Sequence, residues 1–128
     1  MKTTSILVVD DQRTWRELLK EIFVDSGYVC DVASSSQEAL EKLQGKYFNL
    51  AILDIRLVDS DPKNEGGLEV LKWLMENQID TKVIVYTGYP SDERIRTAYL
   101  SEKVIDFLQK REFSGSKILS IIKDAISS

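Results

Sequence analysis

Four short apolar segments recur along this chain, and their alternation with helix-like segments restricts the fold more than any other feature. The first three, 6–9, 50–53 and 83–86, are almost entirely apolar, and the fourth is 104–108. Strands that are apolar on both faces are typical of a parallel sheet that helices cover on both sides. A weaker segment, 28–33, is expected to form one more strand at the edge of this sheet, so the strands in chain order are 6–9, 28–33, 50–53, 83–86 and 104–108.

Amphipathic segments with helical spacing lie between the expected strands, because their apolar residues recur three and four positions apart. The second of them opens with Ser35 and Glu38, a candidate capping box, and Gly27 is expected to end the first. This alternation predicts a doubly wound α/β domain, and right-handed crossovers favour the flavodoxin-like strand order 2-1-3-4-5. The five segments expected as helices are 15–23, 35–43, 68–75, 90–100 and 115–126.

Length, charge and composition exclude several classes of protein. The chain has 128 residues, so we expect one domain over 1–128 with no effector domain in it. The net charge is -4 and the basic residues are scattered, which argues against direct binding of nucleic acid. The longest apolar runs have four residues, too few for a membrane span. With a single cysteine, Cys30, and no apolar signal core after Met1, we expect a cytoplasmic protein.

Histidine is absent from the sequence. Its absence removes the commonest general base and the commonest zinc ligand. Any chemistry must therefore use carboxylates, hydroxyls and lysines.

Three carboxylates follow two of the expected strands: Asp10 and Asp11 end the first, and Asp54 ends the third. In the predicted order these strands are neighbours, about 4.8 Å apart, at the switch point where ligands bind in such folds. Carboxylates at such short distances cannot all stay ionised unless a cation lies between them, and otherwise the pKa of at least one is raised. Oxygen ligands without histidine or cysteine favour a hard ion such as Mg²⁺.

A hydroxyl and an amine complete this edge of the sheet, because Thr87 ends the fourth strand and Lys110 follows the fifth. A cation, an ammonium and a hydroxyl can together neutralise the oxygens of a phosphoryl group in transfer, with a carboxylate as nucleophile. Each residue also has a structural interpretation: Asp11 as a helix N-cap, Asp54 as a turn residue, Thr87 as a strand end and Lys110 as a surface lysine. The coincidence at four strand ends favours the functional interpretation.

These residues resemble the receiver domains of two-component response regulators, the CheY-like family, over essentially the whole chain. The segments that carry the resemblance are Ile6-Leu7-Val8-Val9-Asp10-Asp11, Leu53-Asp54-Ile55-Arg56-Leu57, Thr87-Gly88-Tyr89 and Asp106-Phe107-Leu108-Gln109-Lys110. The resemblance implies a phosphorylation-activated domain in which Asp54 accepts a phosphoryl group from a sensor histidine kinase or phosphotransfer protein. It also implies limited metal-dependent self-phosphorylation and autodephosphorylation.

The resemblance assigns roles to the other site residues as well. Asp11, Asp54 and the backbone carbonyl of Arg56 would hold Mg²⁺ or Mn²⁺, with Asp10 acting largely through water. Thr87 and Lys110 would contact the phosphoryl oxygens, and we expect Lys110 to gain its anionic partner only on phosphorylation. Phe107 would be the switch aromatic, although a core position in the fifth strand is also consistent with it. The output face, 90–100 with 104–108 and 115–126, would bind partners or a second copy of the chain.

Three features depart from the family pattern. Val58 stands where a proline is usual, and the polar insert 59–66 is expected to be a surface loop that could tune partner choice or phosphate lifetime. Arg111 replaces the proline that usually follows the lysine, so we expect a trans peptide bond and a different turn. Lys103 and Val104 replace the small residues that usually precede the fifth strand.

Three other functions are alternatives to a phosphorylated receiver domain. A receiver-like module that binds a partner without phosphorylation is the main alternative. An aspartyl-phosphate hydrolase would take its nucleophile from the first strand, whereas here the candidate closes the third. A flavodoxin would need Ser, Thr or Gly in the first turn, where this chain has the acidic segment 10–14.

Overall fold

The computed structural model describes residues 3–55, 66–88, 98 and 101–127. Strands and helices alternate from β1 to β4 as the sequence predicts, and a short 3-10 helix, η1, follows the last strand, β5. The elements are β1 (Ser5–Val9), α1 (Arg13–Asp25), β2 (Val29–Ala33), α2 (Ser36–Gly45), β3 (Leu50–Asp54), α3 (Gly67–Glu76), β4 (Lys82–Thr87), β5 (Val104–Gln109), η1 (Lys110–Glu112) and α5 (Gly115–Ser127).

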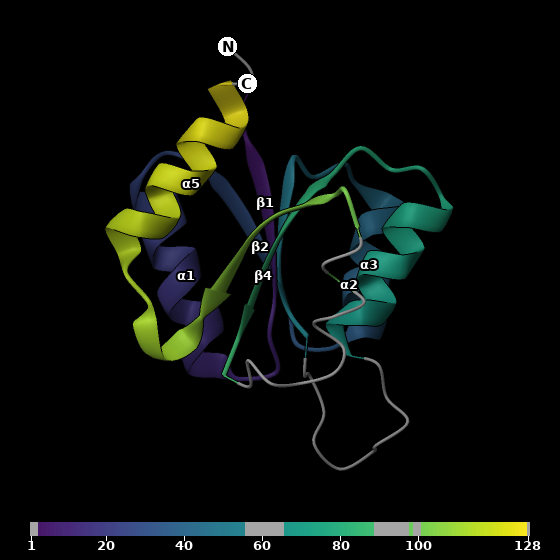
Figure 1. The fold of residues 1–128 in the computed structure, drawn as a ribbon, viewed down its shortest axis with the longest axis horizontal. Coiled ribbons are helices and arrows are strands. Elements are labelled where there is room, and N and C mark those ends of the chain that lie inside the picture. The colour runs from purple at the N-terminus through teal and green to yellow at the C-terminus, as the bar shows by residue number, and fades with distance from the viewer. Residues whose placement is uncertain (1–2, 56–65, 89–97, 99–100, 128) are drawn as a thin grey trace.

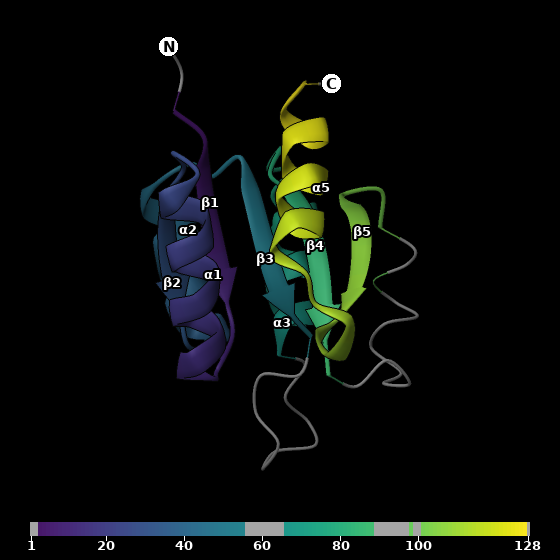
Figure 2. The same ribbon diagram turned by 90° about the vertical axis from the view of Figure 1, so that its left-hand side faces the viewer.

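The five strands form one parallel sheet in the order β2-β1-β3-β4-β5, which confirms the predicted topology (Figure 2). β1 and β3 are direct neighbours, with Val9 opposite Leu53. The weakest predicted strand, β2, lies at the edge. Because all the strands run the same way, the residues that follow them gather at one end of the sheet (Figure 2).

Helices cover both faces of the sheet, α1 and α5 on one side and α2 and α3 on the other (Figure 1). The nearly continuous apolar runs are explained by this arrangement, because successive side chains enter opposite cores. In β1, Leu7 and Val9 belong to the core under α2 and α3, whereas Ile6 and Val8 belong to the core under α1 and α5. All four side chains are fully buried.

The helix boundaries follow the sequence signals closely. α1 ends at Asp25, two positions before Gly27, whose positive φ of 91° suits a helix-terminating glycine. Ser35 caps α2 by accepting a hydrogen bond from the backbone N–H of Glu38 at 3.1 Å. The Glu38 carboxylate accepts a hydrogen bond from the hydroxyl of Ser34 at 3.1 Å. In the expected capping box it would accept from the backbone N–H of Ser35 instead.

Several expectations fall wholly or partly outside the described residues. Four of the five expected α-helices are described; of the segment 90–100, only Ala98 is described, as a buried helical residue. Arg56, Val58 and nearly all of the insert 59–66 also lie outside. No cis peptide bond occurs among the described residues, in agreement with the trans bond expected after Lys110. No helix in the described parts of the chain is long and apolar enough to span a membrane.

Candidate functional site

Three carboxylates meet at the carboxyl end of the sheet, as the strand order predicts. One oxygen from each of Asp10, Asp11 and Asp54 lies within 4.8 Å of the others. Asp10 and Asp54 are buried, whereas Asp11 is exposed and faces the solvent side of the group. The group therefore combines two inner carboxylates with an outer one that a diffusing ion can reach first.

Both carboxylate oxygens of Asp10 are bound to donors from the protein. Oδ1 accepts a hydrogen bond from the backbone N–H of Gln12 at 2.9 Å. Oδ2 accepts one from the hydroxyl of Tyr86 and lies 2.8 Å from Nζ of Lys110. Gln12 is also the N-cap residue of α1, so the alternative interpretation of Asp11 as that cap is wrong.

Lys110 reaches the centre of the site from η1, immediately after β5. Its Nζ lies 2.8 Å from Oδ2 of Asp10 and 2.9 Å from Oδ2 of Asp54, with 10% of its side chain exposed. Burial alone would lower the pKa of Lys110, but the hydrogen bonds and charges of Asp10 and Asp54 outweigh it and raise the pKa. The expectation that Lys110 gains an anionic partner only on phosphorylation is therefore wrong, because it already binds two carboxylates.

The charges of the site fit a divalent cation. Three carboxylates and one ammonium leave two formal negative charges in a small volume. Partial burial and the charge of Asp10 raise the pKa of the Asp11 carboxyl, which shows the cost of adding a third anion. All the side-chain donors are oxygens, which favours Mg²⁺ or Mn²⁺ over softer metals.

The remaining predicted residues lie around this centre. Thr87 is buried at the end of β4, directly after Tyr86, whose Cα partner in β3 is Asp54. Phe107 is partly buried and packs against the core under α2 and α3. Arg56, expected as a carbonyl ligand of the metal, lies outside the described residues.

Gly67, the first residue of α3, packs directly against the backbone of Asp54. Its N–H donates to the carbonyl of Ile55 at 2.9 Å. A Cβ added to Gly67 would lie 2.3 Å from the carbonyl oxygen of Asp54, far closer than packed atoms approach. Only glycine therefore allows α3 to begin this close to the candidate phosphoryl acceptor.

Two aromatic residues of the site were not predicted from the sequence. The sequence patterns place Tyr86 in the apolar strand 83–86 and Trp15 in the expected helix 15–23, and they give neither residue a role in the site. The predicted strand order contains a partial signal for Tyr86, because this residue stands at the end of the strand that neighbours the one carrying Asp54. Trp15 carries no such signal, since its contacts depend on how α1 packs on the sheet.

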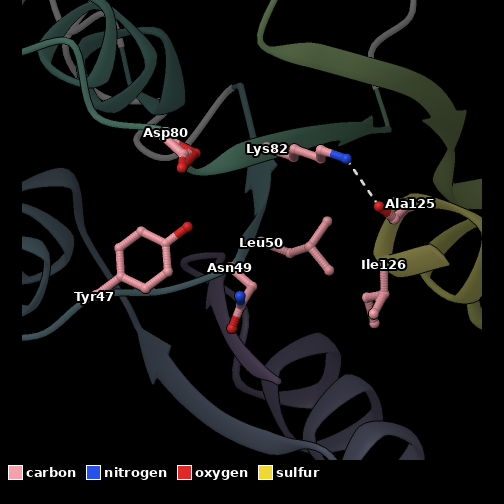
Figure 3. Close-up of a pocket in the computed structure, with 7 residues that line it drawn as sticks. All are labelled: Tyr47, Asn49, Leu50, Asp80, Lys82, Ala125 and Ile126. Atoms are coloured by element: carbon pink, nitrogen blue, oxygen red, sulfur yellow. Dashed lines mark hydrogen bonds between the residues drawn. The ribbon is translucent and has the colours of Figure 1, made fainter. Parts of the chain in front are cut away.

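A cavity of about 220 Å³ lies away from these residues, at the amino ends of β3 and β4 (Figure 3). Its one ammonium, Lys82, donates a hydrogen bond to the carbonyl of Ala125 at 2.8 Å. The acidic cluster lies at the carboxyl ends of the strands, at the other end of the sheet, so the cavity is separate from the candidate site. The residues that line it are Tyr47, Asn49, Leu50, Asp80, Lys82, Ala125 and Ile126.

Comparisons with known proteins agree with the fold. The response regulator receiver domain family matches residues 6–123. A putative NtrX-like response regulator from Rickettsia bellii is 30% identical over 98% of this chain. The matched part is only 25% of that relative's length. The chain is thus similar to one part of a larger regulatory protein.

Solved structures are similar over nearly the whole chain. A CheY-like response regulator receiver domain from Methanospirillum hungatei matches with a TM-score of 0.85 and 28% identity, covering 98% of this chain and 95% of that one. The response regulator TrrA from Thermotoga maritima, solved in complex with Mg(2+)-BeF, matches with a TM-score of 0.76 and 31% identity. That match covers 96% of this chain and 99% of the other.

Proposed function

This chain belongs to the response regulator receiver domain family of two-component systems, and we propose that its Asp54 is the residue that accepts the phosphoryl group. The donor is a phosphohistidine of a sensor histidine kinase or phosphotransfer protein. The observation that carries the proposal is the position of Asp54, a buried carboxylate in contact with Lys110 and grouped with Asp10 and Asp11.

Phosphoryl transfer to Asp54 makes one bond and breaks one. A carboxylate oxygen of Asp54 attacks the phosphorus, the P–N bond of the phosphohistidine breaks, and the imidazole leaves with its electron pair. In dephosphorylation, water attacks the phosphorus, the P–O bond to Asp54 breaks, and inorganic phosphate leaves while the carboxylate is regenerated. Lys110 supplies the positive charge beside the transferred oxygens, with Thr87 as the hydroxyl donor.

A divalent cation, Mg²⁺ or Mn²⁺, would neutralise charge on the phosphoryl oxygens during transfer. Asp11 and Asp54 are proposed as its direct carboxylate ligands. Asp10 is proposed to act through water and through Lys110, because both of its oxygens already accept hydrogen bonds from the protein. The backbone carbonyl of Arg56 remains an expected ligand.

The response to phosphorylation is proposed to run through Lys110, Thr87 and Phe107. An acyl phosphate on Asp54 adds negative charge next to Lys110 and Thr87, and the new contacts favour one of two arrangements of the surface. Phe107 is proposed as the switch aromatic, which turns inward when Thr87 moves toward the phosphoryl group. The surface that changes is the face of 90–100, β5 and α5, which would bind a partner or a second copy of the chain.

Intact-protein mass spectrometry tests the proposal. Incubation with a small phosphodonor and Mg²⁺ should add the mass of one phosphoryl group, and omission of the metal or the substitution Asp54→Asn should prevent it. A wild-type chain that stays unmodified under these conditions, while a known receiver domain is labelled in parallel, would favour the alternative of a receiver-like module without phosphorylation.

A further inference from the structure

Two aromatic rings enclose the ammonium of Lys110. Nζ lies 5.1 Å from the centroid of the Trp15 ring and 5.0 Å from the centroid of the Tyr86 ring. The two rings also contact each other edge to face, with centroids 5.9 Å apart. At these distances each ring attracts a cation, and the attraction is stronger where water is excluded, as it is around this largely buried side chain.

The turn that carries Lys110 is held by the same rings. Phe113, directly after η1, contacts Trp15 edge to face at 5.3 Å, and its N–H donates to the carbonyl of Lys110 at 3.1 Å. Trp15 therefore contacts the turn at both ends, through the ammonium of Lys110 and through the ring of Phe113. This matters because Arg111, unlike a proline, does not restrict the backbone of the turn.

The hydroxyl of Tyr86 has a second role at the carboxylates. It donates to Oδ2 of Asp10, the same oxygen that Lys110 contacts. Asp10 is fully buried, so this oxygen would be costly to leave without a donor. If Lys110 turns toward a phosphoryl group on Asp54, Tyr86 still supplies a hydrogen bond to Asp10.

We propose that Trp15 and Tyr86 are positioning residues of the phosphorylation site. Their rings hold the ammonium of Lys110 over Asp54, and the Tyr86 hydroxyl allows Lys110 to leave Asp10 when the phosphoryl group arrives. The kinetic part of this inference depends on the proposed function, because it assumes that Asp54 is phosphorylated.

Phosphorylation rates with a small phosphodonor test the role of Trp15. Trp15→Leu keeps an apolar side chain but removes the aromatic face, and should slow labelling about five- to tenfold, as expected for a partly buried cation–π contact. Trp15→Phe should recover most of the rate. Trp73→Leu, the same substitution in α3 on the opposite face of the sheet, should leave the rate unchanged. Equal rates for Trp15→Leu and Trp15→Phe would overturn the proposal.

The substitution Lys110→Met shows whether Trp15 acts through Lys110. In that background Trp15→Leu should have no further effect on the rate, since the cation it contacts is gone. A further slowing of fivefold or more would mean that Trp15 acts through another group, and would contradict the proposal. Tyr86→Phe keeps the ring but removes the hydrogen bond from the Tyr86 hydroxyl to Asp10. The loss of this bond alone should slow labelling several-fold.

Nuclear magnetic resonance of lysine-labelled protein provides a measurement that does not require phosphorylation. The two rings should shift the resonances of the Lys110 ε-methylene protons upfield. Part of this shift should remain in Tyr86→Phe and Trp15→Phe, which keep an aromatic ring. In Trp15→Leu, most of the contribution of the Trp15 ring to the shift should be lost. An unshifted signal in the wild-type protein would overturn the proposal even if Asp54 is phosphorylated. A shifted signal in a chain that cannot be labelled would instead reject the proposed function and keep the arrangement of the rings.

Discussion

Lys110 and Asp54 are 56 positions apart in the chain, yet Nζ of Lys110 lies 2.9 Å from Oδ2 of Asp54. The contact joins the end of β5 to the end of β3, with β4 between them in the sheet. Lys110 also binds Asp10 at 2.8 Å, so one ammonium links two buried carboxylates before any phosphoryl group is present. The charge that would stabilise the transferred group is thus already in place, and it also stabilises the unphosphorylated protein.

Removing that charge should destabilise the fold in a way that metal reverses. We expect Lys110→Met to lower the free energy of unfolding by about 3 kcal/mol, because two buried carboxylates lose their cation. Because Mg²⁺ would replace the missing positive charge, it should stabilise the variant more than it stabilises the wild type. Urea unfolding with and without Mg²⁺ measures both effects. Equal stabilisation of the two proteins by Mg²⁺ would show that the metal does not replace the charge of Lys110, and no stabilisation of either would argue against a metal at these carboxylates.

A methyl group at Gly67 should disturb the acceptor residue itself. The added carbon would lie 2.3 Å from the carbonyl oxygen of Asp54, so α3 or the end of β3 must move. We expect Gly67→Ala to cost about 1–3 kcal/mol of stability and to slow phosphorylation of Asp54.

Gly45→Ala is the matched control, because Gly45 is the last residue of α2 and nothing lies within 4 Å of its added carbon. It should be neutral or stabilising by up to about 1 kcal/mol, since alanine favours a helix. Thermal unfolding and labelling rates compare the two substitutions. A Gly67→Ala protein as stable and as active as Gly45→Ala would show that the contact with Asp54 is unimportant.

The hydroxyl of Tyr86 should contribute to stability through Asp10. Tyr86 is 1% exposed, and burial and the nearby charge of Asp10 raise the pKa of its phenol well above the usual range, so the hydroxyl remains a donor at neutral pH. Tyr86→Phe leaves the fully buried Asp10 with one donor fewer and should cost about 1–3 kcal/mol. Tyr47→Phe, at a tyrosine that is 54% exposed, should change stability by less than about 0.5 kcal/mol. Denaturant titrations in which both variants match the wild type would reject this role for the hydroxyl.

Cys30 should make the fold sensitive to alkaline pH. Burial raises the pKa of its thiol to about 11 from an ordinary value of 9.0, so the folded protein binds this proton more tightly than the unfolded chain. The contribution is complete below pH 9 and is lost as the pH rises toward 11. Over that range wild type should lose up to about 3 kcal/mol more than Cys30→Ala, which lacks the group. Parallel curves of unfolding free energy against pH for the two proteins would contradict the assignment.

The sequence was sufficient to predict which strand ends meet, and therefore which carboxylates. Asp10, Asp11 and Asp54 follow strands whose order could be inferred from apolar runs and crossover rules, and Lys110 follows from the same order. The contacts of Trp15 could not be inferred, because they depend on the packing of α1 and of the turn after β5. The position of Tyr86 near the end of its strand could be inferred, but not that its hydroxyl binds Asp10. Periodicity identifies the buried face of a helix or strand, but not which buried side chain will lie beside a polar group.

A crystal structure of the chain with Mg²⁺ and beryllofluoride, a stable mimic of the phosphoryl group, tests most directly whether Asp54 is the acceptor in a shared site. We predict beryllium bonded to a carboxylate oxygen of Asp54, a cation in contact with Asp11 and Asp54, and Nζ of Lys110 within hydrogen-bonding distance of a fluoride. Beryllofluoride bound away from Asp54, or a fluoride group at Asp54 that Lys110 does not contact, would contradict the proposed function of this site.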